Sequence, residues 1–349
     1  MKKISVLLLA LTLTVMSFVS CAKNGVQTDD ASNPDTEVTD SAEETEEAGL
    51  PESVTVRAAG MTGPTSIGMV KVMSDSAKGV SEGTYEFTIA GSADEITPKL
   101  VKGELDIAAV PANLASVLYN KTEKGVKIIA VNNLGVLYML GKNAGVESVG
   151  DLKGKTVYAT GKGSTPEYTL RHILKGNGID PDSDVTIEYK SEPAEIVALL
   201  KESDSGIAML PQPYVTVAKG QVEGLETVLD MNEEWKKIDN TGEIVTGVIV
   251  ARSEFIENHP EAVETFLKEY TASCAYVNEN VEEAANLVEE AGIFKAAIAK
   301  QAIPYCNVTG NVGEEMKKLV SGYLEVLYEE EPKAVGGTLP DEAFYYIAG

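Results

Sequence analysis

The sequence contains few of the residues that build metal centres and disulfide frameworks. Among 349 residues there are three cysteines and two histidines. His172 and His259 alone cannot supply a histidine-built metal site, so we expect no metal. Cys274 and Cys306 could pair in an oxidising compartment, but two cysteines make no disulfide framework. We expect both to be structural thiols, and the sequence leaves their pairing open.

Basic residues are also scarce, with 29 Lys and Arg against 54 Asp and Glu and a formal net charge of −25. Residues 22–52 hold ten of the acidic groups and one lysine, which leaves about −18 on the remaining mature chain. Such a charge excludes nucleic acid as a partner, because phosphate binding needs a basic surface. Solubility is a sufficient reason for the acidity, so it indicates no cationic ligand.

The sequence has only one long apolar run, at residues 4–19, directly after Lys2 and Lys3. It is short for a membrane span of ~20 residues and is typical of a signal peptide. Phe18-Val19-Ser20-Cys21 resembles a bacterial lipobox, although Phe18 stands where leucine is commoner. We therefore expect a lipoprotein signal at 1–20 and lipid attachment at Cys21. The alternative is an ordinary secretory signal followed by a chance cysteine.

The acidic segment at 21–52 has almost no large apolar residues. It cannot bury enough apolar surface to offset its ordering entropy, so we expect a disordered tether extended by charge repulsion. With no second apolar run, the mature chain is expected to contact the membrane only through its lipid. We expect it outside the cytoplasm, on the cell surface or in the periplasm.

From residue 53 onward, short β-type runs alternate with longer helical runs, which predicts α/β layers with a parallel-dominated sheet. Two such series and a chain of about 300 residues predict two lobes. Lobe 1 comprises 53–141 plus 244–349, and lobe 2 is inserted at 142–243. Residues 244–250 suit the middle of a sheet, and everything after His259 is predicted helical. The expected strands are 54–59, 85–90, 107–110, 126–132, 156–160, 185–189, 206–210, 225–229 and 244–250; the expected helices are 64–74, 94–102, 111–120, 165–176, 194–202, 213–221, 261–277, 281–291, 295–302 and 314–329.

Two strand-end loops with related sequences open the first helix of each lobe. At the carboxyl ends of parallel strands, glycine allows close backbone approach and Ser or Thr caps free N–H groups, which suits an anion or polar acceptor. One such loop could merely cap its helix; two at matching places favour a shared ligand. The predicted ligand-binding residues are Gly63, Pro64, Thr65 and Ser66 in the first loop and Gly163, Ser164 and Thr165 in the second.

Three further strand-end turns are expected to face the same cleft, and they add Asn113, Gln212, Tyr214 and Thr246 to the predicted site. Asn113 and Gln212 offer donors and acceptors, and Tyr214 offers a ring and a hydroxyl. Asn113 could equally be a helix cap, and Tyr214 could pack in the core. Neither loop matches a nucleotide-binding motif, so no cofactor is expected.

Motifs for catalysis are missing from the sequence. It has no Gly-x-Ser-x-Gly elbow, and neither histidine lies beside a serine or cysteine in a recognisable motif. We therefore expect no catalytic residues and no enzymatic activity.

Several segments carry a family resemblance that covers residues 53–344. They are Asp106-Ile107-Ala108-Ala109-Val110-Pro111, Asp151-Leu152-Lys153-Gly154-Lys155-Thr156-Val157, Gly163-Ser164-Thr165-Pro166-Glu167-Tyr168 and Ala208-Met209-Leu210-Pro211-Gln212-Pro213. The chain resembles the solute-binding proteins of ABC importers for nitrate, sulfonates, taurine and pyrimidine precursors. The resemblance implies a two-lobe periplasmic-binding-protein fold of type II, which closes on a ligand between the lobes.

The resemblance also implies partners: a small-molecule ligand and the permease and ATPase subunits of the importer, with the binding protein acting as a monomer. The expected ligand is a sulfonate- or nitrate-like anion or a small heterocycle such as a pyrimidine precursor. The sequence departs from an arginine-built anion site, because no arginine is expected at the cleft. The alternative functions are an exported enzyme on the same fold, as in menaquinone or pyrimidine biosynthesis, and a surface adhesin.

Overall fold

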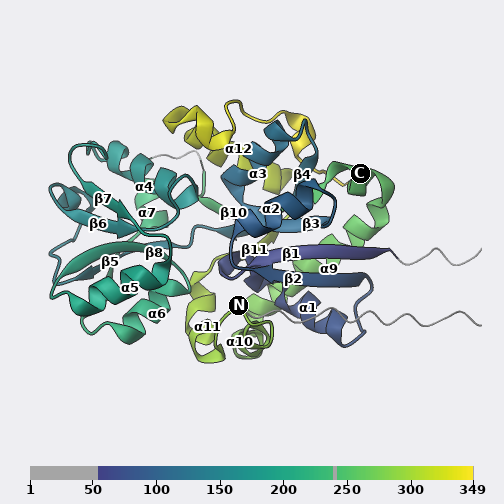
Figure 1. The fold of residues 1–349 in the computed structure, drawn as a ribbon, viewed down its shortest axis with the longest axis horizontal. Coiled ribbons are helices and arrows are strands. Elements are labelled where there is room, and N and C mark those ends of the chain that lie inside the picture. The colour runs from purple at the N-terminus through teal and green to yellow at the C-terminus, as the bar shows by residue number, and fades with distance from the viewer. Residues whose placement is uncertain (1–53, 239–241, 349) are drawn as a thin grey trace, which may run out of the picture. The chain divides into compact units, whose positions relative to one another are not determined.

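The computed structural model describes residues 54–238 and 242–348 (Figure 1). The predicted signal peptide, the lipid attachment at Cys21 and the acidic tether lie outside the described residues. Within the described residues, no helix combines the length and the apolarity needed to cross a bilayer.

The strands form two separate sheets. The first has the order β11-β4-β10-β3-β1-β2. β10 lies between β3 and β4, so the prediction that this apolar run occupies the middle of a sheet is confirmed. Its strands are β1 (Thr55–Met61), β2 (Thr84–Ala90), β3 (Ile107–Pro111), β4 (Val126–Leu134), β10 (Val245–Arg252) and β11 (Val308–Asn311).

The second sheet has the order β7-β6-β8-β5-β9 and is built from one continuous stretch of the chain. β6 pairs in parallel with both β7 and β8, whereas β5 runs antiparallel between β8 and β9. Its strands are β5 (Leu137–Lys142), β6 (Thr156–Ala159), β7 (Thr186–Tyr189), β8 (Gly206–Pro211) and β9 (Leu225–Asp230).

Most strands of each sheet run in the same direction, as predicted: β1, β2, β3 and β4 in the first sheet and β6, β7, β8 and β9 in the second. The antiparallel pairings that the sequence did not predict enter mainly through β5 and β10, which run against both of their neighbours. Each of these strands follows a passage of the chain from one sheet to the other. It therefore begins at the edge where the neighbouring strands end, and it runs in the opposite direction to them. The predicted inserted segment begins at Lys142, which is the last residue of β5, a strand that the sequence reading missed. The chain passes from the first sheet to the second at residues 135–136.

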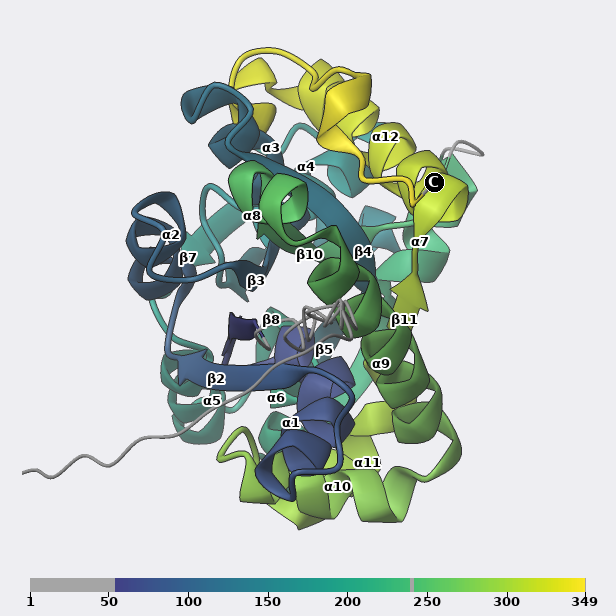
Figure 2. The same cartoon turned by 90° about the vertical axis from the view of Figure 1, so that its right-hand side faces the viewer.

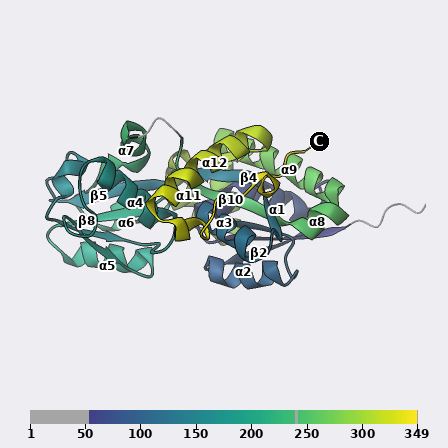
Figure 3. The same cartoon turned by 90° about the horizontal axis from the view of Figure 1, so that it is seen from above.

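Helices cover both faces of the first sheet. α3 and α12 contact β4 and β10 on one face, while α9 packs with α1 and β11 on the other. Figure 2 shows α3 and α12 above the sheet and α1, α10 and α11 below it, and Figure 3 shows α12 lying over β4. These helices are α1 (Val70–Ala77), α2 (Ala93–Val101), α3 (Ala112–Lys121), α8 (Ser253–Asn258), α9 (Pro260–Glu279), α10 (Val281–Glu290), α11 (Ala296–Ala302) and α12 (Gly313–Glu330).

The second sheet is covered in the same way. α4 and α7 pack together on one face, and α5 and α6 pack on the other. The helices are α4 (Thr165–Gly176), α5 (Pro193–Glu202), α6 (Tyr214–Gln221) and α7 (Met231–Ile238), and the 3-10 turns of the whole described chain are η1 (Pro64–Met69), η2 (Val149–Leu152), η3 (Ile303–Tyr305), η4 (Pro332–Val335) and η5 (Glu342–Phe344).

Alternation along the strands divides the core of the first sheet. In β3, Ala108 and Val110 face the α3 and α12 side, whereas Ile107 and Ala109 face the α9 side. Successive side chains of a strand point to opposite faces, so an all-apolar strand fills both layers. The α12 layer continues onto the second sheet, where Trp235 of α7 packs against Tyr323 of α12.

Three further elements were missed by the sequence reading. α7 and α8 are short helices beside strands, and β11 contradicts the prediction that everything after His259 is helical. β11 is four residues long and pairs with β4 at the edge of the sheet. Such a short strand is stabilised by its partner, so its own sequence carries little periodic signal.

Candidate functional site

The carboxyl edges of the two sheets are joined directly by the chain. β3 and β4 both run antiparallel to β10, so β4 ends at Leu134 on the edge where β1 and β3 also end. β5 begins at Leu137, whose register partner is Pro211 at the end of β8. Leu134 and Leu137 are three residues apart in the chain, so their Cα atoms can lie at most ~11 Å from each other. The loops that follow β1, β3, β6 and β8 therefore face one another across this crossing.

The first loop (residues 63–66) is held tightly from within the lobe. The Ser66 hydroxyl is fully buried and donates to Met61 O at 2.7 Å. The side-chain amide of Asn132 donates to Thr65 O at 3.1 Å. The Thr65 hydroxyl itself is buried and has no hydrogen-bond partner among the described residues. One hydroxyl therefore shapes this loop, and the other remains available.

Two more predicted residues lie at the same edge. Gly247 pairs with Pro111, so Thr246 and the turn before Asn113 are neighbours across β10 and β3. A β-carbon placed on Gly247 would lie 2.8 Å from Thr65 Cγ2, which shows how closely this backbone approaches the first loop. Thr246 Oγ1 and Asn113 Oδ1 are buried and unpartnered within the described chain.

The orientation of the Asn113 amide follows from its surroundings. Its Nδ2 donates to Ala334 O at 3.2 Å, and a carbonyl can only accept. Oδ1 is therefore the atom left without a partner, so the side chain offers an acceptor. The prediction that Asn113 could serve as a helix cap is not supported, since no side-chain cap bond is present at the start of α3.

The second loop (residues 161–165) is also held by a serine hydroxyl, and in addition by a glutamate of the helix that follows it. The Ser164 hydroxyl donates to Gly161 O at 2.9 Å, and the Gly163 N–H donates to Glu167 Oε2 at 2.6 Å. Thr165 is only 1% exposed, and its hydroxyl makes no hydrogen bond of ordinary length among the described residues, although its contact with the buried Tyr323 of α12 acts to lower the pKa of that phenol, which burial raises. The Gly163 N–H, predicted to meet the ligand, is thus already engaged by the helix that follows it.

Gln212 and Tyr214 lie one strand away from the second loop, because β6 and β8 are adjacent. Gln212 is buried, and its Oε1 accepts from Thr216 Oγ1 at 2.9 Å. The ring of Tyr214 packs edge-on against Phe294, with ring centroids 5.3 Å apart. Phe294 precedes α11, so Tyr214 makes an aromatic contact between elements of the two sheets.

The chain's three arginines are all paired away from this edge. Arg57 binds the Asp106 carboxylate through two nitrogens at 2.8 and 2.6 Å, and Arg252 adds a contact at 3.4 Å. Burial acts to raise the pKa of Asp106, but the bonds from Arg57 and the charge of Arg252 hold it below its ordinary value. Asp106 precedes β3, at the opposite edge of the sheet, and Arg171 pairs with Asp182 at 2.7 Å.

Cys274 and Cys306, the cysteines within the described residues, are buried and free. Burial raises the pKa of Cys274 to about 12, while a contact from Tyr270 acts in the opposite direction. Burial also raises the pKa of Cys306. Protonated thiols are poor nucleophiles, so the positions of both residues fit the structural role predicted for them.

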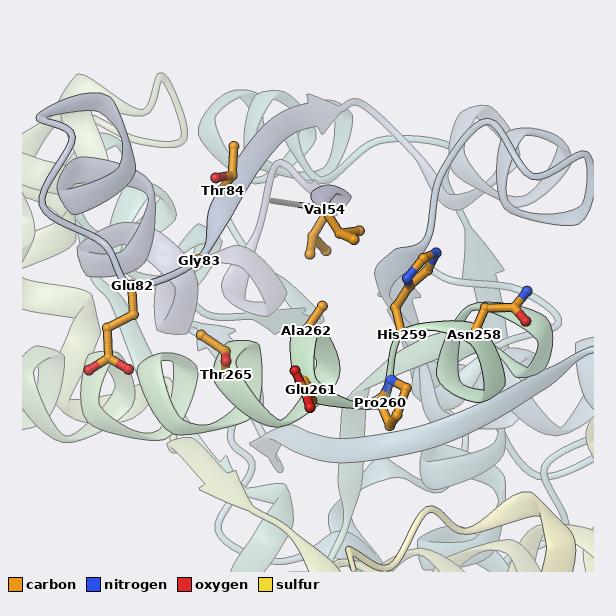
Figure 4. Close-up of a pocket in the computed structure, with 11 residues that line it drawn as sticks. Val54, Glu82, Gly83, Thr84, Asn258, His259, Pro260, Glu261, Ala262 and Thr265 are labelled. Carbon is orange, nitrogen blue, oxygen red and sulfur yellow. The ribbon is translucent and has the colours of Figure 1, made fainter. Parts of the chain in front are cut away.

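A pocket at the opposite edge of the first sheet contains none of the predicted site residues. It has a volume of about 630 Å³ and lies where β1 and β2 begin (Figure 4). Figure 4 shows His259 and Pro260 at the start of α9 beside Val54, with Glu82 on the other side. Its position excludes it from the cleft between the sheets.

Asn132 and Asn133 belong to the site but were missed by the sequence reading. Asn133 Nδ2 donates to Cys306 O at 2.8 Å, as Asn132 does to Thr65 O. Each is 1% exposed and keeps an unpartnered Oδ1. Two consecutive asparagines at the end of an apolar strand were the available signal, because buried amides need specific partners.

Comparison with known proteins places the chain in a family. The profile of the NMT1-like family matches residues 78–291, which is more than half of the chain. The chain belongs to the NMT1-like family. A comparison of the chain with curated proteins found no match.

Solved structures share the fold of the NMT1-like protein. An ABC transporter structure from Parabacteroides distasonis is 23% identical with a TM-score of 0.71, covering 84% of this chain and 98% of that one. The aliphatic sulphonate-binding protein SsuA of Escherichia coli is 17% identical with a TM-score of 0.66, covering 81% and 90%. The alkanesulfonate-binding protein SsuA of Xanthomonas axonopodis, bound to MOPS, is 13% identical with a TM-score of 0.61, covering 79% and 93%. The predicted family resemblance and the α/β periplasmic-binding-protein fold are confirmed.

Proposed function

We propose that this protein is the extracytoplasmic, lipid-anchored solute-binding component of an ABC importer. It captures a small molecule between its two lobes and delivers it to the permease, whose ATPase subunits drive uptake. A single chain is sufficient for capture. The ligand is a sulfonate- or nitrate-like anion or a small heterocycle such as a pyrimidine precursor.

One observation carries this proposal. Thr65, Asn113, Thr165 and Thr246 were predicted as ligand-binding residues, and each holds a buried polar atom without a hydrogen-bond partner among the described residues. A buried polar group without a partner costs ~1–3 kcal/mol, so groups of this kind gather where a ligand supplies the missing bonds. They lie near the ends of β1, β3 and β6 and at the start of β10, on the edges of the two sheets that the crossing at residues 135–136 joins.

The charge distribution limits the classes of ligand that fit the site. All three arginines are paired elsewhere, so no bidentate guanidinium is available to a phosphate or a carboxylate at the loops. Hydroxyl groups and amide oxygens favour a ligand that both donates and accepts hydrogen bonds, or an anion bound without ion pairing. The names of the similar structures, which include sulfonate-binding proteins, support the same choice.

A thermal-shift screen tests the capture of a small molecule. Sulfonates, nitrate, pyrimidines and other small heterocycles are added to the mature protein, and hits are confirmed by calorimetry. At least one compound is expected to raise the unfolding temperature, because a ligand bound only by the folded state stabilises it. If no compound of these classes binds, the proposed ligand class is wrong.

Membrane attachment is tested separately through Cys21. Replacing Cys21 with Ser removes the acceptor for the lipid, so the variant should leave the membrane fraction and remain able to bind ligand. Membrane fractionation in detergent-free buffer is the measurement. A Cys21→Ser variant that stays with the membranes would contradict the lipid anchor without affecting the proposal of solute binding.

A further inference from the structure

A second pocket lies between elements of the two sheets. It has a volume of about 720 Å³ and is bounded by α6, β5 and β9 on one side and by α11 and η3 on the other. Tyr138, Tyr305, Pro304 and Val215 supply apolar surface. The polar lining residues are Gln212, Thr216, Lys219, Thr227 and Gln301, with Gly220 beside them.

The pocket is lined by Gln212, one of the predicted site residues, and a series of contacts leads from its lining to the first loop. Asn132, which binds Thr65 O, is followed by Asn133, which binds Cys306 O. The neighbouring Tyr305 O accepts from Tyr138 Oη at 3.3 Å, and both tyrosines line the pocket. On the other side, Gln212 follows β8, one strand or ~4.8 Å from the strand that leads to Thr165.

The charge of the pocket is unusual for this acidic protein. Its lining contains one cation, Lys219, and no carboxylate. The pocket in Figure 4, by contrast, includes Glu82 and Glu261. Lys219 is exposed and takes part in none of the ion pairs found among the described residues. Because Lys219 is the charged residue of a lining without carboxylates, the pocket is positive in a chain with a net charge of −25, which favours an anion there.

We propose that this pocket holds the distal part of the captured ligand, and that the ligand is an organic anion with an apolar or aromatic body. The body lies against Tyr138, Pro304 and Tyr305, and the anionic group lies within reach of Lys219. The uncharged polar end lies at the threonines of the two loops, where no arginine is available. This inference rests on the proposed function, and it identifies the substrate as an elongated molecule with its charge at one end.

Calorimetry with paired probes tests the charge preference. The probes are aryl sulfonates and aryl carboxylates, each paired with its neutral sulfonamide or carboxamide, which keeps the shape and removes the charge. At least one anion should bind more tightly than its amide. Lys219→Gln should weaken that anion about fivefold and leave the amide unchanged. Lys201→Gln, at an exposed lysine of α5 outside the pocket, is the matched control and should change neither.

A larger side chain in the lining of the pocket tests whether the ligand binds there. A β-carbon added at Gly220 meets no heavy atom within 4 Å, and Gly220 lies in α6, where other residues are better helix formers. Because Gly220 lines the pocket, Gly220→Leu is expected to narrow it without disturbing the fold. It should weaken the anion at least tenfold while the unfolding temperature of the free protein stays the same or rises.

The outcomes separate this inference from the proposed function. The inference is wrong if no anion binds more tightly than its amide, or if Lys219→Gln leaves every such difference in affinity unchanged. If Thr65→Val and Thr165→Val abolish binding but Gly220→Leu does not, the ligand sits at the loops alone, and only this inference fails. If Gly220→Leu abolishes binding and the threonine variants do not, the pocket is a separate anion site and the proposed placement of the captured ligand fails.

Discussion

The two strand-end loops use the same parts in opposite order. In the first loop Thr65 precedes Ser66, and in the second Ser164 precedes Thr165. In both, the serine hydroxyl donates to a backbone carbonyl a few residues earlier in the chain, and the threonine hydroxyl is buried and makes no hydrogen bond of ordinary length in the described chain. Serine shapes each loop, and threonine presents the available group.

The loops differ in what holds them. The first loop is fixed by residues remote in sequence: Asn132 binds Thr65 O, and the adjoining Gly68 packs against Cys274 of α9. The second loop is held by its own chain through Ser164 and Glu167, and its Gly163 is exposed. The geometry of the first loop therefore depends on the whole lobe, whereas that of the second depends on α4. This difference can be tested by matched substitutions in the two loops.

The largest effect is expected when both threonine hydroxyls are removed. Thr65→Val with Thr165→Val keeps the side-chain shape and deletes two unpartnered hydroxyls. Ligand affinity should fall by ~10-fold or more. The unfolding temperature should stay the same or rise, because replacing an unpaired buried hydroxyl with a methyl group removes a desolvation penalty.

Calorimetry with a ligand from the screen and thermal unfolding together check this prediction. Each single variant should lose part of the affinity if both loops hold one ligand. A double variant that binds as tightly as the parent, or that unfolds at a lower temperature, would contradict the assignment of these hydroxyls.

Glycine substitutions should separate the packed loop from the exposed one. A β-carbon on Gly60 would lie 2.2 Å from Ser66 Oγ, so Gly60→Ala must displace a fully buried hydroxyl. We expect a loss of ~2 kcal/mol in the free energy of unfolding. Gly163 has a φ of +75° but open space around it, so Gly163→Ala should cost only ~1 kcal/mol of backbone strain. Urea unfolding measures both; the reverse order would show that the first loop is not held by packing.

The two serine substitutions should also destabilise the first loop more than the second, with a smaller difference in the free energy of unfolding than the glycine substitutions. Ser66→Ala breaks a buried bond and leaves Met61 O without that partner, at a cost of ~1–2 kcal/mol. Ser164 is half-buried, so Ser164→Ala should cost ~0.5 kcal/mol because water replaces its bond. Chemical unfolding of the two variants side by side is the measurement. Equal losses would mean that the second loop is as dependent on tertiary contacts as the first.

The last prediction concerns the far end of α4, where Glu330 of α12 accepts from His172 at 3.2 Å and pairs with Lys175. Burial acts to raise the pKa of Glu330, but these two partners hold it below its ordinary value. Glu330→Gln should therefore cost ~1 kcal/mol at neutral pH.

The sign of the pH dependence follows from the lowered pKa. The stabilisation by Glu330 is complete above the ordinary glutamate pKa of ~4.3 and is lost as the pH falls through the lowered value. The difference in unfolding free energy between the parent and Glu330→Gln should shrink below about pH 4. Glu329→Gln, on the exposed side of α12, is the control. A difference that persists in acid would show that Glu330 acts through packing.

Several buried polar residues of the candidate site could be predicted from the sequence, because strand ends are marked locally. Gly, Pro, Ser and Thr after an apolar run signal a turn into a helix, and parallel strands bring such turns to one edge. That reasoning reached Thr65, Thr165, Asn113 and Thr246. It could not separate serine from threonine within each loop, since both cap helices equally well in sequence.

Asn132 and Asn133 were beyond the same reasoning. Their partners, Thr65 O and Cys306 O, lie 67 and 173 residues away along the chain. β5 and β11 were missed for a related reason, because each is defined by pairing with a strand distant in sequence. Contacts of this kind leave no local periodicity.

The sequence by itself determined the alternation of strands and helices, the central position of β10 and the strand-end loops, because these depend on hydrophobic pattern and turn chemistry over a few residues. Only the tertiary structure decided which hydroxyls are left without partners and which pocket adjoins them. Both depend on backbone carbonyls and side chains brought together from separate segments. The hydrogen bonds of a buried site are decided by which groups lie within bonding distance in space, not by which residues are neighbours in sequence.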